Sequence, residues 1–202
     1  MSFCFSGAHR TGKSTLARDV SNRLQIPYYD GSAGRIMKEL GLNAVDNMSI
    51  EDRIDAQEKL LEQYLKEIAA LPRPFITDRS PLDMIGYIFG EITMHNTNKE
   101  IGDRAISYME KCLRAAANNF DTIFFVRPLN VYEVDSSKPP LNNAYQWEIQ
   151  FIIEGTANLI NDYVSFAILQ TTDLKGRVKS SSEMIINRIM QMREDRQSAM
   201  LQ

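Results

Sequence analysis

The first 15 residues contain the feature that most constrains this chain. An apolar run from Ser2 to Ser6 is followed by Gly7-Ala8-His9-Arg10-Thr11-Gly12-Lys13-Ser14, which matches the pattern G-x-x-x-x-G-K-[ST]. The glycines let the backbone turn tightly, so that successive N–H groups face an anion. A helical pattern over 12–24 follows, and the positive end of that helix points at the same place. We therefore predict that residues 7–14, called the phosphate loop below, bind phosphate groups.

We expect the phosphate loop to bind ATP together with Mg²⁺. Lys13 would contact the β- and γ-phosphates, and Ser14 would offer its hydroxyl to Mg²⁺. His9 stands at a variable position of the loop and is interpreted as a spacer. The predicted ATP-binding residues are Gly7, Arg10, Thr11, Gly12, Lys13, Ser14 and Thr15.

Short apolar runs alternate with helical periodicities along the chain. Strands are predicted at 2–6, 27–29, 74–77, 122–126 and 166–169, and helices at 12–24, from 49 to the prolines at 72 and 74, from 81, and at 101–117, 145–163 and 181–193. This order predicts right-handed crossovers and one three-layer α/β/α domain over 1–202 with a five-stranded parallel sheet. We expect Trp147, Phe151 and Leu159 on the apolar side of their helix, and Ile106 on that of 101–117.

Two carboxylates follow predicted strands. In open parallel sheets, ligands sit beyond the carboxyl ends of the strands, so Asp30 and Asp78 should lie near the phosphate loop. Asp30 can equally be a turn residue, because Asp-Gly is a common turn pair. Asp78 can instead cap the helix that begins at Pro81.

The residues around Asp78 carry a family resemblance. Thr77-Asp78-Arg79-Ser80 resembles the D/E-R-[SYH] signature of thymidylate and deoxynucleoside kinases, in the superfamily of P-loop nucleoside and nucleotide kinases. The run from Asp78 to Asp83, followed by Tyr87, resembles small AAA-type kinases related to nicotinamide-riboside kinases, several of them viral. The resemblance implies that Asp78 assists Mg²⁺ or the acceptor, that Arg79 binds a phosphate, and that Asp30 accepts the proton of an acceptor hydroxyl.

These observations predict the residues of an active site. The catalytic candidates are Lys13, Asp78, Arg79 and Asp30; the substrate-binding candidates are Asp30, Arg35, Arg79, Asp83 and Lys138; the metal ligands are Ser14 and Asp78. Arg35, Arg53 and Tyr64 are expected in the wall of the acceptor pocket.

The segment 127–143 is rich in Pro, Asn and Ser and is long for a connection, so we predict a lid. Related kinases usually carry arginines there, whereas this chain has only Lys138 between Leu129 and Glu148, with Arg127 just before. A lysine cannot grip a phosphate bidentately as an arginine can. The sequence leaves open which of the two serves as the lid cation.

Composition narrows the class of protein. The formal net charge of −3 shows no basic excess, which argues against a dedicated nucleic-acid binder. The N-terminus has no secretion signal, and no apolar run is long enough to cross a membrane. The two cysteines, Cys4 and Cys112, are interpreted as buried apolar residues, which points to the cytoplasm. The sequence leaves a homodimer open.

We therefore predict an ATP- and Mg²⁺-dependent phosphotransferase of nucleotide metabolism, whose acceptor is a small (deoxy)nucleoside or its monophosphate. One alternative is a kinase acting on a nucleotide within DNA or on a polynucleotide end, for which a basic groove would be expected beside the acceptor pocket. Others are a P-loop ATPase or GTPase that has no acceptor, and an inactive nucleotide-binding module.

Overall fold

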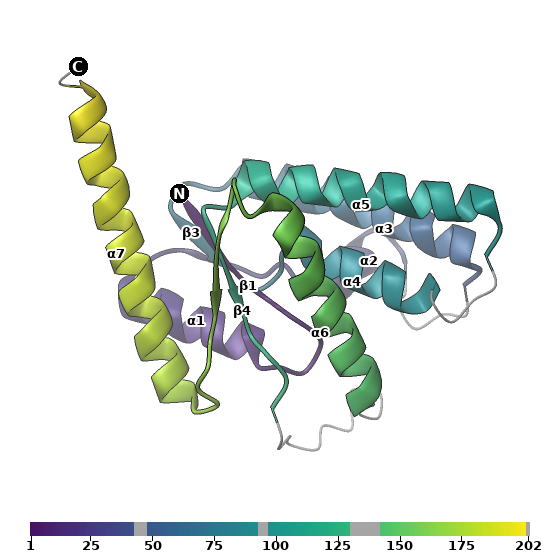
Figure 1. Ribbon diagram of the computed structural model, residues 1–202, viewed down its shortest axis with the longest axis horizontal. Coiled ribbons are helices and arrows are strands. Elements are labelled where there is room, and N and C mark those ends of the chain that lie inside the picture. Colours follow the sequence, from purple (N-terminus) through teal and green to yellow (C-terminus); the bar gives the residue numbers. More distant parts are fainter. Residues whose placement is uncertain (43–47, 93–96, 130–141, 201–202) are drawn as a thin grey trace.

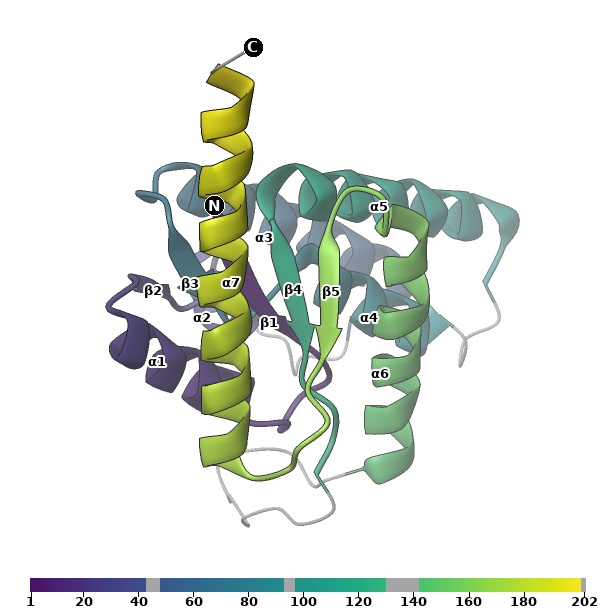
Figure 2. The ribbon, with the colours of Figure 1, turned by 60° about the vertical axis from the view of Figure 1, so that its left-hand side comes forward.

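The sheet is parallel throughout, as the sequence predicts. The computed structural model describes residues 1–42, 48–92, 97–129 and 142–200. Its five strands follow the order β2-β3-β1-β4-β5, and every neighbouring pair is parallel (Figures 1 and 2). The strands are β1 (Ser2–Ser6), β2 (Tyr28–Tyr29), β3 (Phe75–Thr77), β4 (Thr122–Phe125) and β5 (Ser165–Ile168).

Helices cover both faces of this sheet and complete three layers. They are α1 (Lys13–Leu24), α2 (Ala33–Glu39), α3 (Ile50–Ala69), α4 (Pro81–Ile92), α5 (Lys99–Asn119), α6 (Asn143–Ala157) with a short 3₁₀ turn (Asn158–Ile160), and α7 (Leu174–Met200). Helices α1 and α7 lie together on one face, and α4 packs against α3, α5 and α6 on the other (Figure 1). The predicted three-layer α/β/α fold is confirmed.

The side chains of β1 alternate between the two faces of the sheet, and each face carries its own apolar cluster. Successive side chains of a strand point to opposite faces of its sheet. Phe3 and Phe5 pack among the apolar residues of α1 and α7, whereas Cys4 packs with those of α3 to α6. All three side chains are fully buried, so β1 reads as a continuous apolar run, as expected for a strand covered on both faces. Cys4 and Cys112 are both buried and unpaired, as predicted.

Several helix ends agree with the predicted boundaries, whereas two helices differ. The Ser49 side chain accepts a hydrogen bond from the Asp52 backbone N–H, and so caps α3 at the residue where the sequence predicts that this helix begins. Helix α2 was not predicted, because its seven residues are too short to show a clear periodicity. Helix α7 runs well beyond the predicted 181–193 at both ends.

The prediction for the apolar side of α6 was wrong. Phe151 is 64% exposed and Leu159, in the 3₁₀ turn that follows, is 62% exposed, whereas Ile149 and Ile153 are fully buried. Two glycines of α4 face these isoleucines. A Cβ would lie 2.5 Å from Ile149 Cδ1 at Gly90 and 2.8 Å from Ile153 Cγ1 at Gly86, so a larger residue at either position would force the isoleucine to move.

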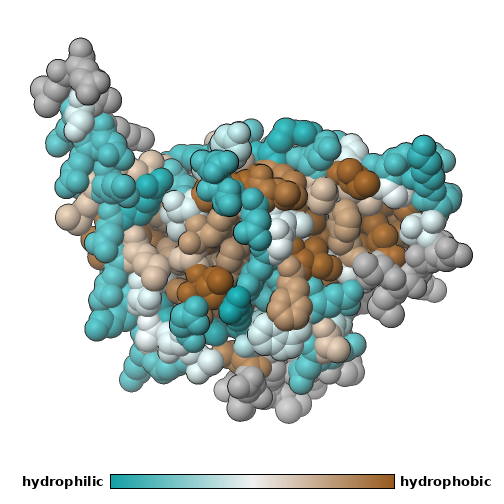
Figure 3. Space-filling view, in the orientation of Figure 1, coloured by the Kyte–Doolittle hydropathy of each residue, from teal (hydrophilic) through white to brown (hydrophobic). Residues whose placement is uncertain are grey.

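Some large apolar side chains remain on the surface. Figure 3 shows apolar surface between α7 and α6, where the edge strand β5 lies. Ile106 on α5 is 49% exposed, although the sequence placed it on the core side. Among the described residues, no helix is both long and apolar enough to span a bilayer.

Candidate active site

A cavity of about 720 Å³ opens at the carboxyl ends of the central strands. Strand β1 ends at Ser6 and leads into the phosphate loop, and its neighbour β3 ends at Thr77 and leads to Asp78. The cavity is lined by the phosphate loop and by residues of α2, α3, α4 and α6: His9, Arg10, Thr11, Gly12, Lys13, Ser14, Thr15, Ser32, Ala33, Gly34, Met37, Arg53, Gln57, Asp78, Arg79, Tyr87, Glu91, Asn142 and Tyr145. The cavity lies at the edge of the sheet where the strand order predicts that ligands sit.

The backbone of the phosphate loop needs its two glycines. Gly7 has φ +150° and Gly12 has φ +83°, both in the region that disfavours side chains. A Cβ on Gly7 would also lie 2.5 Å from the Val126 carbonyl oxygen. Helix α1 begins directly after Gly12, so its N-terminal N–H groups face the loop.

Asp83 holds the start of the phosphate loop from behind. Its Oδ1 accepts hydrogen bonds from the Gly7 backbone N–H at 2.8 Å and from the Ser6 hydroxyl, and its Oδ2 accepts one from the Ser80 backbone N–H at 3.3 Å. The side chain is fully buried and does not line the cavity. Predicted as a substrate-binding residue, Asp83 is instead placed as a support of the loop.

We expect Asp83→Asn to lower the free energy of unfolding by about 1–2 kcal/mol, because a buried donor that loses its acceptor costs about that much. The new amide can replace Oδ1 as an acceptor, but its NH₂ group would face the Ser80 N–H, which is also a donor. Chemical denaturation of the variant, with the exposed Asp162→Asn as control, measures the difference. Equal stability of both variants would contradict this role.

Helices α6 and α7 hold the rest of the loop through side chains that the sequence analysis missed. Gln150 Oε1 accepts from the Ala8 N–H at 3.0 Å, and Gln146 Nε2 donates to the His9 carbonyl at 2.6 Å. Arg177, only 4% exposed, donates to the carbonyls of Thr11 at 3.2 Å and Thr171 at 2.7 Å. The two glutamines stand four residues apart on the buried face of α6, a spacing that could have marked them.

Two cations face the cavity beside the loop. Lys13 is 7% exposed and donates to the Ala8 carbonyl at 2.5 Å. Burial lowers the pKa of Lys13 to about 8, although Asp83 opposes this shift. The guanidinium of Arg79 lies 5.6 Å from the centroid of the Tyr87 ring, and its buried Nε has no hydrogen-bond partner within the described part of the chain. Both side chains are therefore suited to bind an anion.

The two predicted carboxylates lie in different surroundings. Asp78 is 3% exposed, lines the cavity and accepts a hydrogen bond from the Gly31 N–H at 3.0 Å. Asp30 lies outside the residues that line the cavity. Its side chain accepts from the Ser32 N–H at 3.0 Å and lies 3.6 Å from the Arg18 guanidinium, and it is 40% exposed. The structure thus brings Asp78 to the phosphate loop and turns Asp30 toward Arg18.

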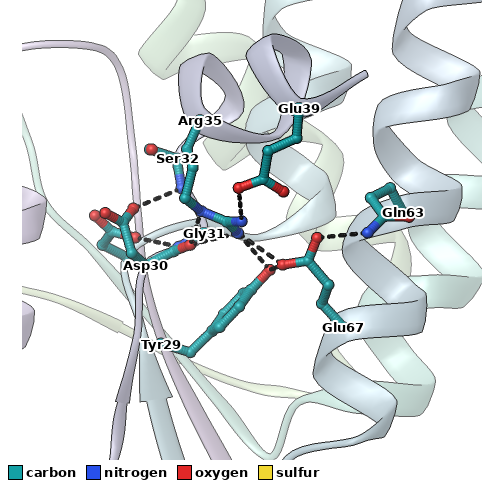
Figure 4. Close-up of polar contacts among 9 residues, drawn as sticks. Tyr29, Asp30, Gly31, Ser32, Arg35, Glu39, Gln63 and Glu67 are labelled. Atoms are coloured by element: carbon teal, nitrogen blue, oxygen red, sulfur yellow. Dashed lines mark hydrogen bonds and ion pairs between the residues drawn. The ribbon is translucent and has the colours of Figure 1, made fainter. Parts of the chain in front are cut away.

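Arg35, on α2, belongs to a polar cluster between α2 and α3 (Figure 4). Its guanidinium donates to Glu67 at 2.7 Å, to Glu39 at 2.9 Å and to the Tyr29 hydroxyl at 2.9 Å. Gln63 also donates to Glu67, at 2.8 Å. Arg35 does not line the cavity, so the structure places this predicted substrate-binding residue as a tie between α2 and α3. The tie positions the residues of α2 that do line the cavity.

We expect Glu67→Gln to lower the free energy of unfolding at neutral pH by about 1 kcal/mol, because charge-assisted hydrogen bonds stabilise a fold by roughly that amount or more. Burial alone would raise the pKa of Glu67, but hydrogen bonds from Tyr29, Arg35 and Gln63 outweigh it and lower this pKa. A lowered pKa means that the contribution is present at neutral pH and lost on acidification.

The difference between wild type and Glu67→Gln should therefore shrink as the pH falls through the folded-state pKa of Glu67. Denaturation curves at several pH values test this, with the exposed Glu62→Gln on the same helix as control. A difference that does not change with pH would contradict the ionic role of Glu67.

Other predicted residues are placed away from the cavity or outside the described residues. Arg127 pairs with Glu154 at 2.5 Å instead of facing the cavity. Lys138 and most of the predicted lid lie outside the described residues. Tyr64 is buried and donates to the Arg79 carbonyl, so it supports the wall from behind, whereas Arg53 lines the cavity as expected.

A family model described as an AAA domain matches residues 2–156, which is most of the chain. The chain belongs to this family. A comparison of the chain with curated proteins found no match.

Solved structures resemble this AAA domain at low sequence identity. Deoxyadenosine kinase from M. mycoides, in a structure with dCMP and dCDP, is 17% identical with a TM-score of 0.63, covering 95% of this chain and 100% of its own. Thymidylate kinase from Candida albicans is 14% identical with a TM-score of 0.62, covering 92% and 91%. YorR protein from Bacillus subtilis is 14% identical with a TM-score of 0.54, covering 96% and 98%. The AAA domain therefore has the fold of P-loop kinases.

The residues of the AAA domain fit a magnesium ion bound together with phosphates. Ser14 and Asp78 both line the cavity, and hydroxyl and carboxylate oxygens are the donors that Mg²⁺ prefers. Mg²⁺ is usually held by one or two protein side chains plus substrate phosphates and water. Among the described residues there is no group of three or more His, Cys, Asp or Glu that could hold a metal.

Proposed function

We propose that this protein transfers the γ-phosphoryl group of ATP to a small (deoxy)nucleoside or its monophosphate, with Mg²⁺ as cofactor. The observation that carries this proposal is the meeting of Lys13, Ser14, Asp78 and Arg79 around one cavity of about 720 Å³. Catalysis of phosphoryl transfer consists mostly of positioning and charge neutralisation, which is what these groups can supply.

Each residue has a role that follows from its placement. The N–H groups of the phosphate loop and Lys13 would hold the β- and γ-phosphates, and Arg79, which lines the same cavity, would bind a phosphate oxygen. Ser14 and Asp78 would hold Mg²⁺, which neutralises charge on the phosphates when bound. Asp78 would also orient the attacking group of the acceptor.

The cavity supports a small acceptor over the alternatives. Its volume lies in the range of sites for small molecules, and Asp78 and Glu91 line it beside the cations, so its wall is not a purely basic groove. An ATPase, which transfers phosphate to water, would not need the part of the cavity that α2, α3, α4 and α6 line beyond the phosphate loop. The M. mycoides kinase, which has this fold, holds dCMP in its structure.

Release of ADP from ATP and Mg²⁺ tests the proposal. The protein is incubated with nucleosides, with deoxynucleoside monophosphates, with a DNA oligonucleotide, and without an acceptor. We expect one of the small acceptors to accelerate ADP release strongly over the reaction without acceptor. Acceleration by DNA alone, or equal rates with and without every small acceptor, would contradict it.

A further inference from the structure

Three aromatic side chains from three different elements gather on one side of the cavity. His9 belongs to the phosphate loop, Tyr87 to α4 and Tyr145 to α6, and all three line the cavity. The ring centroid of His9 lies 6.4 Å from that of Tyr87 and 5.8 Å from that of Tyr145, and each pair of rings is inclined by 36°. The three side chains are partly exposed, and each contributes to the lining of the cavity.

The side chains of His9, Tyr87 and Tyr145, called the aromatic wall below, are held in place by contacts with neighbouring residues. The His9 carbonyl accepts a hydrogen bond from Gln146, one residue after Tyr145, and so ties the loop to α6. On α4, Gly90 lies beside the Tyr145 ring: a Cβ at position 90 would be in ordinary contact with Tyr145 Cε2, at 3.4 Å. Arg79 lies over the Tyr87 ring at 5.6 Å. The wall is therefore preorganised next to the residues that would bind the transferred phosphate.

We propose that His9, Tyr87 and Tyr145 form an aromatic wall on which the planar base of the acceptor stacks, so that the enzyme selects nucleosides or their monophosphates over base-free sugars. The inference rests on the proposed function and assigns the selection of the acceptor to residues of this chain. His9 is then a specificity residue, and not the spacer that its variable position in the loop indicates.

The chemistry of His9 agrees with stacking. Burial, together with the cations of Lys13, Arg10 and Arg79, lowers the pKa of His9, so the imidazole is neutral at pH 7. A neutral ring can stack on a base without adding a further charge beside these cations. Alanine substitution of an aromatic residue that stacks on a base costs about 1–3 kcal/mol. That corresponds to roughly a fivefold to 150-fold loss of affinity.

The test compares acceptors that differ only in the base. A deoxynucleoside monophosphate is paired with deoxyribose 5-phosphate, and a deoxynucleoside with deoxyribose, and kcat and KM are measured for each at saturating ATP. Wild type should prefer the acceptor that carries a base. His9→Ala and Tyr145→Ala should each raise its KM about tenfold or more. Their KM for ATP should change little.

Two further sets of variants keep the inference falsifiable. His9→Phe and Tyr145→Phe retain the planar rings and should keep most of the preference, whereas His9→Leu and Tyr145→Leu fill similar space without a planar ring and should lose it. Phe151→Ala, on the exposed side of α6, serves as control and should leave both KM values unchanged. Thermal unfolding of all variants shows whether they are folded.

The possible failures are distinct. If wild type phosphorylates acceptors with and without a base equally well, or if the alanine variants keep the KM of wild type, the aromatic wall is not a base site, although the phosphotransferase proposal survives. If no acceptor of either kind is phosphorylated, the proposed function itself fails, and the stacking inference fails with it.

Discussion

Replacing Lys13 with alanine is expected to lower turnover about a thousandfold while the protein remains folded. Removal of a single donor that stabilises developing charge in a transition state typically costs about 100- to 1,000-fold in turnover. Lys13 is positioned for such a role by the loop, because its ammonium donates to the Ala8 carbonyl and the residue lines the cavity. The Lys13 side chain is almost fully buried.

That burial bears on stability as well as on catalysis. Burying a charge is unfavourable, and it lowers the pKa of Lys13 to about 8, so removing this ammonium relieves a cost of folding. Turnover and thermal unfolding are therefore measured on the same variant, with the exposed Lys179→Ala as control. Turnover of Lys13→Ala near that of the wild type would contradict phosphoryl transfer at this loop.

Asp78→Asn should lower turnover by about a hundredfold or more, and by much more than Asp30→Asn does. Asn keeps the size of Asp78 and can still accept from the Gly31 N–H, so the change removes mainly the negative charge. That charge faces the cavity next to Lys13 and Ser14, where Mg²⁺ and the acceptor would lie.

Asp30 supplies a matched comparison. Its carboxylate is 40% exposed, faces Arg18 and does not line the cavity, so we expect Asp30→Asn to change turnover by about threefold or less. Turnover of both variants is measured on one identified acceptor. If Asp30→Asn proves the more damaging variant, the roles are reversed, and Asp30 is the residue that accepts the acceptor proton.

The sheet and most of the helices could be predicted because their signals are local. A strand buried on both faces, such as Thr122–Phe125, is a continuous apolar run, and a capped helix such as α3 shows its start at Ser49. The apolar side of α6 could not be predicted in the same way. It depends on glycines of α4, which are distant in sequence and bring Ile149 inward while Phe151 remains exposed.

In the candidate site, too, features with a local sequence signal could be predicted, and features that depend on distant residues could not. The phosphate loop and Asp78 follow from motif and strand order, because the carboxyl ends of neighbouring parallel strands meet. The supports of the loop do not follow, since Gln150 and Arg177 reach it from far along the chain. The surroundings of Arg35 do not follow from the sequence either, because its partner Glu67 lies on another helix, 32 residues along the chain.

Transfer of label from γ-labelled ATP tests the central claim most directly. The protein is incubated with the labelled ATP, Mg²⁺ and a deoxynucleoside or deoxynucleoside monophosphate, and the products are separated. We predict that the label appears in the phosphorylated acceptor, in amounts equal to the ADP formed, and that Lys13→Ala abolishes its appearance. Label found only in inorganic phosphate, at a rate that no acceptor changes, would contradict a phosphotransferase and indicate an ATPase.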